Sequence, residues 1–135
     1  MSVDKARLHP PSASVFMPFA AISPEPIGVV EGTALAGEVV VRPLMVSADA
    51  LLLHFFRSKG VRDPEHVHHD HDTVCHLLSG RLRLCIGGEI FEAGPGDSWH
   101  HPRGVVHWSE ALEDSVQVEV KSPPVKTWRS PVAGS

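Results

Sequence analysis

The chain has 135 residues, 42% of them hydrophobic and 21% charged, and a net charge of −4 with the histidines neutral. This length builds one domain around a single core, and the mildly acidic composition lacks the basic surface that a nucleic-acid or membrane-surface partner requires. No secretory signal is visible and no apolar run approaches the roughly 20 residues of a membrane helix, so we expect a cytoplasmic protein with a small-molecule substrate.

Residues 1–28 are rich in proline, at Pro10, Pro11, Pro18, Pro24 and Pro26. So many prolines exclude both a helix and a central strand. The same segment carries apolar side chains between Val15 and Ile22, which would be costly to leave in water. We expect an N-terminal arm, residues 1–28, that packs on the domain formed by residues 29–135 or on a second subunit, and therefore a homodimer.

From Gly37 onward the sequence is typical of β-strands, with runs of branched and aromatic residues that end at turn formers. The predicted strands are residues 38–46, 50–58, 73–79, 81–86, 89–94, 105–112 and 115–122. Alternation is clearest over residues 81–86, where leucines would face inward and arginines outward. No segment has a helical period, so we predict an all-β fold, an antiparallel barrel of two sheets of the jelly-roll type. His54 lies inside an apolar run, where packing is more usual than ligation.

The chain contains two cysteines, Cys75 and Cys85. If the chain turns at Ser79 and Gly80, these two side chains face each other across a hairpin, and a bridge is geometrically conceivable. The preferred interpretation is a pair of buried, reduced thiols in a cytosolic protein.

Most of the ten histidines lie between Gly60 and His107. His66 and His68 are two residues apart, which puts both on one side of an extended strand. His107 follows a Pro-x-Gly turn, after enough chain for several strands to run out and return. Two imidazoles from one strand and one from a distant strand suit a metal site with open positions. His69 and His101 are expected to be exposed or to bridge polar loops.

The spacing around these histidines resembles the two motifs of the cupin superfamily. Gly60, His66, His68 and Gly80 match the first motif, in which Thr73 stands where the family has glutamate. The second motif is matched by Gly96, Pro102, Gly104 and His107, with Ala111 where the family often has asparagine. The resemblance spans roughly residues 35 to 122 and implies a cupin barrel.

The resemblance implies that His66, His68 and His107 bind a divalent transition metal, and zinc, iron, nickel and manganese all accept imidazole. Thr73 is a neutral and poor candidate for the fourth ligand. His71 or Asp72 could replace it by a shift of one or two residues, and strand alternation puts His71 on the same face as Thr73. A site of three histidines keeps a net positive charge, which favours a substrate that is anionic or becomes so.

The tail also resembles a pattern of small cupins, an acidic residue followed by x-x-Ser-Pro-x-Arg. Here Glu119 is followed by Ser122 and Pro123, but Val125 stands where arginine is expected. This pattern is similar to that of cupins that linearise unsaturated uronates, and the chain also resembles polyketide-cyclase cupins. Because the arginine is missing, only Glu119 is carried over, as a candidate proton carrier.

These features predict a metal-dependent enzyme that uses the ion as a Lewis acid on a small keto, hydroxy or carboxylate substrate. Glu119 or His76 would move the proton, giving lyase, isomerase or cyclase chemistry without redox change. One alternative is a dioxygenase that uses ferrous iron and O2. Another is a cupin that binds a small molecule without catalysis.

Overall fold

The computed structural model describes residues 3–129, so residues 1–2 of the expected arm and residues 130–135 of the expected barrel lie outside the described residues. Two short 3-10 helices, η1 (Lys5–Arg7) and η2 (Phe19–Ala21), precede the strands. The strands are β1 (Glu25–Pro26), β2 (Val29–Val30), β3 (Thr33–Ala34), β4 (Val39–Val46), β5 (Leu51–Arg57), β6 (Arg62–His66), β7 (Asp72–Ser79), β8 (Leu82–Ile86), β9 (Glu89–Ala93), β10 (Ser98–His101), β11 (His107–Ala111), β12 (Ser115–Ser122) and β13 (Trp128–Arg129). Within residues 3–129 no helix has the length and apolar character needed to cross a membrane.

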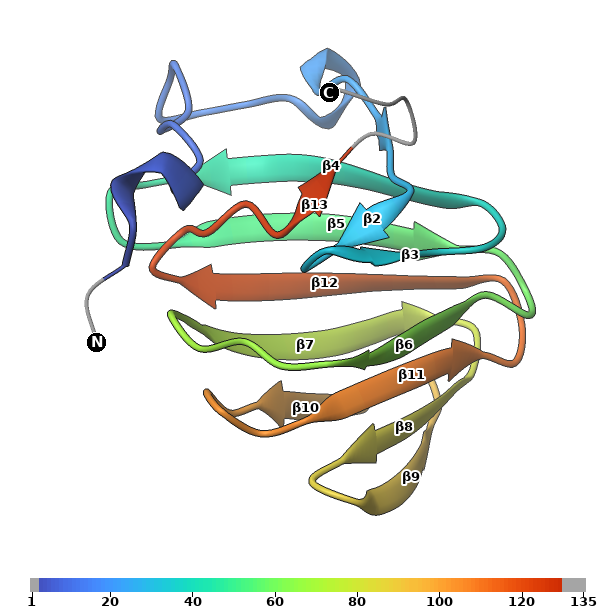
Figure 1. Ribbon diagram of the computed structural model, residues 1–135. Coiled ribbons are helices and arrows are strands. Elements are labelled where there is room, and N and C mark those ends of the chain that lie inside the picture. Colours follow the sequence, from blue (N-terminus) through green and yellow to red (C-terminus); the bar gives the residue numbers. More distant parts are fainter. Residues whose placement is uncertain (1–2, 130–135) are drawn as a thin grey trace.

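Two antiparallel sheets form the barrel (Figure 1). The first has six strands in the order β1-β4-β5-β12-β7-β10, and the second has four in the order β6-β11-β8-β9. Strands β2, β3 and β13 form a small third sheet. This arrangement confirms the predicted jelly-roll barrel. The seven predicted long strands are all present, and the strand expected at His66 and His68 is β6, which ends at His66 and does not include His68. The sequence reasoning missed the short strands β1, β2, β3, β10 and β13.

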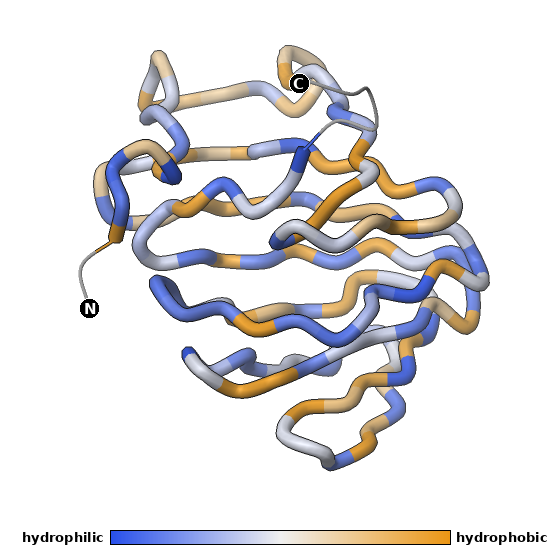
Figure 2. Tube along the Cα trace, in the orientation of Figure 1, coloured by the Kyte–Doolittle hydropathy of each residue, from blue (hydrophilic) through white to orange (hydrophobic). Residues whose placement is uncertain are grey.

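Side chains alternate between the interior and the outer face along the long strands β5 and β12. Figure 2 shows that hydropathy also changes along these strands. One buried apolar cluster lies on β4 and β5 and the elements next to them, and includes Val41, Leu53 and Phe55. A second lies on β7, β8, β9 and β11 and includes Leu77 and Leu82. Between β5 and β7 the sheet contains β12, whose buried side chains belong to neither cluster. The barrel therefore has a polar lining between two apolar parts.

The cysteines do not face each other across a hairpin. Strands β7 and β8 belong to different sheets, so the chain crosses between the sheets at Gly80. Gly80 has φ of +92°, and a Cβ there would clash with Ser115 and with the backbone of Asp114, so only glycine fits this tight crossing. Cys75 and Cys85 are both free and buried, as the preferred interpretation states.

The N-terminal segment runs along its own barrel. The amide of His9 donates to the Pro124 carbonyl at 2.8 Å, and that of Ser12 donates to the Val46 carbonyl at 2.9 Å. Further along, the Phe19 ring packs edge-on against His54, with 5.4 Å between ring centroids. His54 is therefore a packed residue of the outer face. Packing of this segment on a second subunit stays a prediction.

Candidate metal centre

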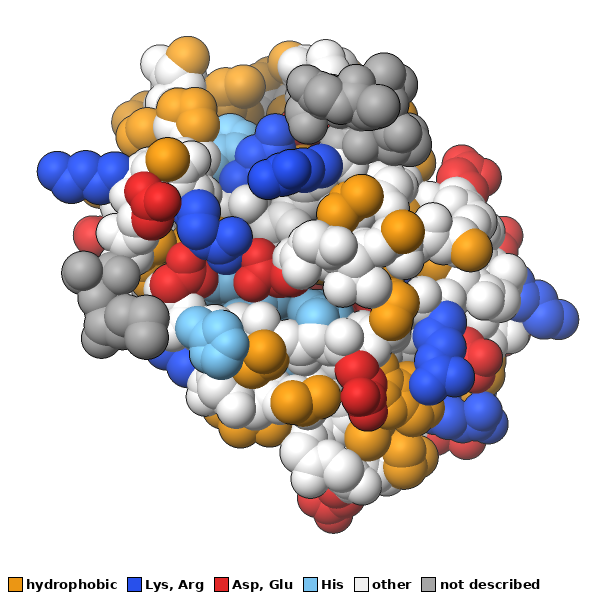
Figure 3. All heavy atoms as spheres, viewed as in Figure 1, with side chains coloured by type: hydrophobic (Ala, Val, Ile, Leu, Met, Phe, Trp, Pro, Cys, Tyr) orange, Lys and Arg blue, Asp and Glu red, His pale blue; other side chains and the backbone are white. Residues whose placement is uncertain are grey.

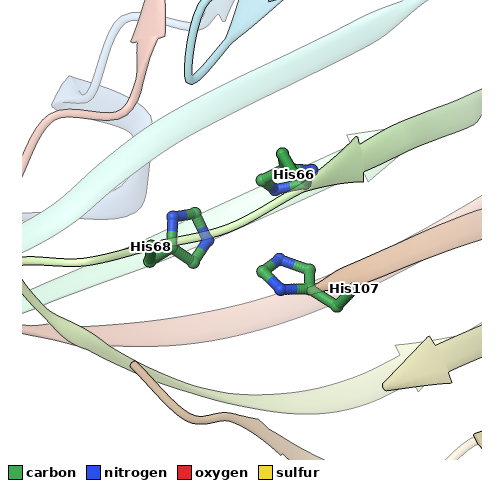
Figure 4. A group of neighbouring side chains, drawn as sticks. All are labelled: His66, His68 and His107. Carbon is green, nitrogen blue, oxygen red and sulfur yellow. The ribbon is translucent and has the colours of Figure 1, made fainter. Parts of the chain in front are cut away.

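Three histidines converge between the two sheets, at one end of the barrel. His66 ends β6, His68 follows it in the connection to β7, and His107 begins β11, where it is the cross-strand partner of His66. One ligand nitrogen from each ring lies within 4.8 Å of the others. Figure 4 shows the three rings directed toward one common space. The spacing that predicted a shared site therefore corresponds to residues that the fold brings together.

The outer nitrogen of each ring has a partner that sets its orientation. Nδ1 donates to the Pro64 carbonyl at 2.9 Å in His66, to Glu31 Oε2 at 3.3 Å in His68, and to the Val105 carbonyl at 3.3 Å in His107. With the proton on Nδ1, the lone pair of Nε2 is free for a metal ion. In His107 this Nε2 is buried and has no hydrogen-bond partner among the described residues. These rings fit a divalent transition metal.

Burial keeps the imidazoles of His68 and His107 neutral. Burial, followed by the positive charge of Lys121, lowers the pKa of His68 far below its ordinary value. Burial and the nearby His66 ring lower the pKa of His107 to about 4. Because a metal binds the neutral ring, the two histidines are ready for coordination at neutral pH without the cost of losing a proton.

His101 is a fourth histidine of this cavity, and the prediction that it is exposed or bridges polar loops was wrong. Its ring is buried and stacks on His107, with 3.7 Å between centroids and 13° between planes. The physical reason is register: His101 on β10 pairs directly with Thr73 on β7, so both point into the barrel. His69 is exposed, as predicted.

At the fourth ligand position, Thr73 is buried and its Oγ1 accepts a hydrogen bond from Lys121 Nζ at 3.1 Å. His71 is also buried; its Nδ1 contacts Asp70 at 2.8 Å, and its Nε2 has no partner among the described residues. The His71 ring lies 4.4 Å from that of His68. Asp72 faces outward beside His100, so the structure does not bring it to the centre. Thr73 and His71 both border the histidine group.

Of the two proton carriers predicted from sequence, only Glu119 reaches the cavity. Glu119 Oε1 accepts from Gln117 at 2.7 Å, and Oε2 lies 3.4 Å from Lys121 Nζ. Burial raises the pKa of Glu119, but the charges of Lys121 and Arg57 outweigh burial and the net shift is downward, so the carboxylate is ionised. His76 points out of the barrel, where it contacts Ser98, because strand alternation puts it opposite Thr73. His76 is therefore not positioned to move a proton at this centre.

Lys121 and Arg57 are interior cations that the sequence reasoning missed. Arg57 contacts Asp63, Ser109 and Gln117 inside the barrel. Residues 115–122 alternate valine with polar residues, and the valines were the natural choice for the core. The structure has the opposite face inward, with Gln117, Glu119 and Lys121 buried. The alternation was a visible signal, but it does not say which face is inside.

A wide cleft lies at the mouth of the barrel, next to the histidines. Its volume is about 710 Å³, and its lining includes Arg7, Glu31, His69, Asp70 and Thr127. A small cavity of about 20 Å³ lies among the histidines and also reaches Thr127. Figure 3 shows histidine atoms at the bottom of a hollow, with acidic and basic side chains around it. Thr127 lines both spaces, so the cleft lies next to the cavity that contains the histidines.

Ion pairs and hydrogen bonds link the N-terminal segment to His68 and His71. Arg7 lies 2.8 Å from Glu31 Oε1 and 2.7 Å from Asp70 Oδ2, and these two acids in turn contact His68 and His71. Glu31 has a φ of +47°, unusual for a residue other than glycine. The turn at Glu31 therefore holds one carboxylate between Arg7 and His68.

Replacing Glu31 with alanine is expected to weaken zinc affinity by about 10- to 100-fold, because His68 loses the carboxylate that fixes its ring orientation and tautomer. Competition with a chromophoric chelator measures this affinity. Glu65→Ala is the matched control, since Glu65 precedes His66 but is exposed. Equal zinc affinities for the two variants would show that Glu31 does not support the centre.

Comparisons with known proteins support the same architecture. A family model described as a cupin domain matches residues 55–121, which include all three histidines and Glu119. No curated protein is significantly similar to the chain.

Several solved structures share the fold. KdgF from Halomonas sp. is 24% identical with a TM-score of 0.61, over 63% of this chain and 78% of that chain. An RmlC-like cupin from Shewanella frigidimarina NCIMB 400 is 20% identical with a TM-score of 0.72, and the match covers 82% of this chain and 92% of that chain. A predicted oxalate decarboxylase from Thermotoga maritima is 19% identical with a TM-score of 0.65, and the match covers 76% of this chain and 93% of that chain. At these identities the likeness concerns the fold alone.

Proposed function

The chain belongs to the cupin superfamily, and from this membership we propose that it is a metal-dependent enzyme whose ion is held by His66, His68 and His107. One observation carries the proposal: the three rings each have Nδ1 tied to an outer partner, and their ligand nitrogens lie within 4.8 Å of one another. Zinc, iron, nickel and manganese all suit such a set.

The chemistry we propose is a non-redox rearrangement, of the isomerase, lyase or cyclase type, on a small keto, hydroxy or carboxylate substrate. A bound ion would supply Lewis acidity toward a substrate oxygen. Glu119 is ionised and lines the same cavity as the histidines, so its carboxylate can accept a proton from the substrate. Phe55 and Val30 line this cavity and limit the access of water.

Metal analysis of freshly purified protein is the first test, and about one equivalent of a divalent transition metal per chain is expected. Turnover that persists without O2 supports the non-redox proposal. Turnover that needs both iron and O2 would instead identify a dioxygenase, a role that three neutral histidines also suit. Tight binding of a ligand that stays unchanged would identify a binding protein.

We also propose that the protein is a homodimer. The outer face of the six-stranded sheet exposes Val74 and Leu78 on β7 and Val120 on β12, and Val120 is the cross-strand partner of Val74. In the N-terminal segment, Val15 and Phe16 are 99% and 73% exposed. Apolar side chains grouped in this way favour burial against another copy of the chain. Sedimentation equilibrium measures the mass, and a monomer at micromolar concentration would contradict the proposal.

A further inference from the structure

Lys121 is a buried ammonium group with a free hydrogen-bond donor. Its side chain is 3% exposed, on the inward face of β12. Nζ donates to Thr73 Oγ1 at 3.1 Å and lies 3.4 Å from Glu119 Oε2. An ammonium carries three N–H donors, so these two partners, which are its contacts within residues 3–129, leave one donor for a ligand. Buried charges of this kind are rare unless they are fully paired.

The position of Lys121 relates this donor to the metal centre. Lys121 lines the small cavity together with His66, His68 and His107. Glu119, which Lys121 contacts, lines the same cavity. The free donor of Lys121 and the ligand nitrogens therefore border one space.

The charges around this space do not balance once a divalent ion is bound. Among the described residues, the cations Lys121 and Arg57 and the anions Glu119 and Asp63 inside the barrel sum to zero. Behind His68 and His71, Glu31 and Asp70 share the single cation Arg7 and leave one negative charge, which offsets only half the charge of a divalent ion. A divalent ion adds two positive charges that the neutral histidines do not offset. Two cationic groups in a poorly solvated cavity repel each other unless an anion lies between them. Where glutamate would provide this negative charge, the chain has Thr73, hydrogen-bonded to Lys121.

We propose that Lys121 is a specificity residue that binds the carboxylate of the substrate beside the metal ion, so that the substrate is a small 2-oxo or 2-hydroxy carboxylic acid. This inference rests on the proposed function, because the ion is part of the site. Thr73 and Glu119 hold the ammonium in place, and the third N–H of Lys121 donates to the substrate carboxylate. A neutral ketone or alcohol of the same size lacks this contact and leaves the ammonium without its third partner.

Calorimetric titration of zinc-loaded protein tests the inference with pyruvate and with pyruvamide, its uncharged counterpart. Wild-type protein is expected to bind pyruvate at least about tenfold more tightly than pyruvamide, the size of effect of one charge-assisted hydrogen bond. Lys121→Met should lose about a tenfold part of this preference, the part that Lys121 contributes beyond the attraction of the ion, and keep its affinity for pyruvamide. Lys126→Met is the matched control, since Lys126 is an exposed cation at the mouth and its loss should leave the preference unchanged.

Removing Lys121 alone leaves the Glu119 carboxylate without its cation, which can unfold the chain. The double variant Lys121→Met with Glu119→Gln removes both charges, and it should show the same loss of preference.

The zinc content of every sample distinguishes a failure of the proposed function from a failure of the carboxylate-binding role of Lys121. If wild-type protein retains no zinc after incubation with it, the proposed function is wrong and the inference fails with it. Zinc-loaded wild-type protein that binds pyruvate and pyruvamide equally would overturn the inference alone. A zinc-loaded double variant that keeps the whole preference for pyruvate would also overturn it, since another group would then hold the carboxylate.

Discussion

Replacing His107 with alanine is expected to abolish metal retention in a barrel that still folds. His107 supplies one of three converging nitrogens, and its buried Nε2 has no other hydrogen-bond partner among the described residues. Mutating a residue that only hydrogen-bonds to a metal ligand weakens metal affinity by up to roughly 100-fold. Losing the ligand itself should weaken metal affinity by more than this. Metal content per chain, measured by mass spectrometry after gel filtration, checks the result.

Two features make this test specific. The core clusters of apolar side chains contain none of the histidines, so circular dichroism and a cooperative thermal transition should be preserved. His69→Ala is the control, because His69 is next to His68 in the sequence but exposed at the mouth. If the His107 variant keeps a full equivalent of metal while folded, the ion is held elsewhere and the ligand assignment is wrong.

The sequence was sufficient for the barrel and for the histidines that come together. Strand alternation and turn residues give the order of long strands, and the motif spacing places His66, His68 and His107 in one pattern. Alternation and turn residues are local features of the sequence. The histidines are far apart in the sequence, but the motif specifies their spacing. The jelly-roll topology brings the histidines together in space, because it pairs β6 with β11 and so His66 with His107.

The parts that were missed depend on which strands are neighbours. His101 enters the cavity because β10 pairs with β7, and Lys121 enters it because the polar face of β12 turns inward. Neither fact can be read from residues near in sequence, since a strand of period two has two equivalent faces until its neighbours are known. The hairpin expected for Cys75 and Cys85 was wrong for the same reason: the chain crosses between sheets at Gly80.

Replacing Arg57 with alanine is expected to destabilise the protein by about 3–5 kcal/mol, the cost of breaking a buried ion pair from one side. Arg57 is 2% exposed and contacts Asp63 at 3.3 Å as well as Ser109 and Gln117. Its guanidinium also lies over the Phe55 ring, at 5.2 Å from the centroid. Asp63 is 14% exposed and its Oδ1 already lacks a hydrogen-bond partner among the described residues, so without Arg57 this mostly buried carboxylate has no cation and keeps the hydrogen bond from Ser109.

Urea unfolding of metal-free protein measures this effect, so that metal binding does not contribute. Arg83→Ala is the matched control: Arg83 pairs with Glu110 at 3.4 Å at the surface, and its loss should change stability by less than about 1 kcal/mol. Removing both charges with Arg57→Leu and Asp63→Asn should recover part of the loss, because no uncompensated charge then remains. If Arg57→Ala costs no more than Arg83→Ala, the interior polar network does not stabilise the barrel, and its retention must be explained by the site that it surrounds.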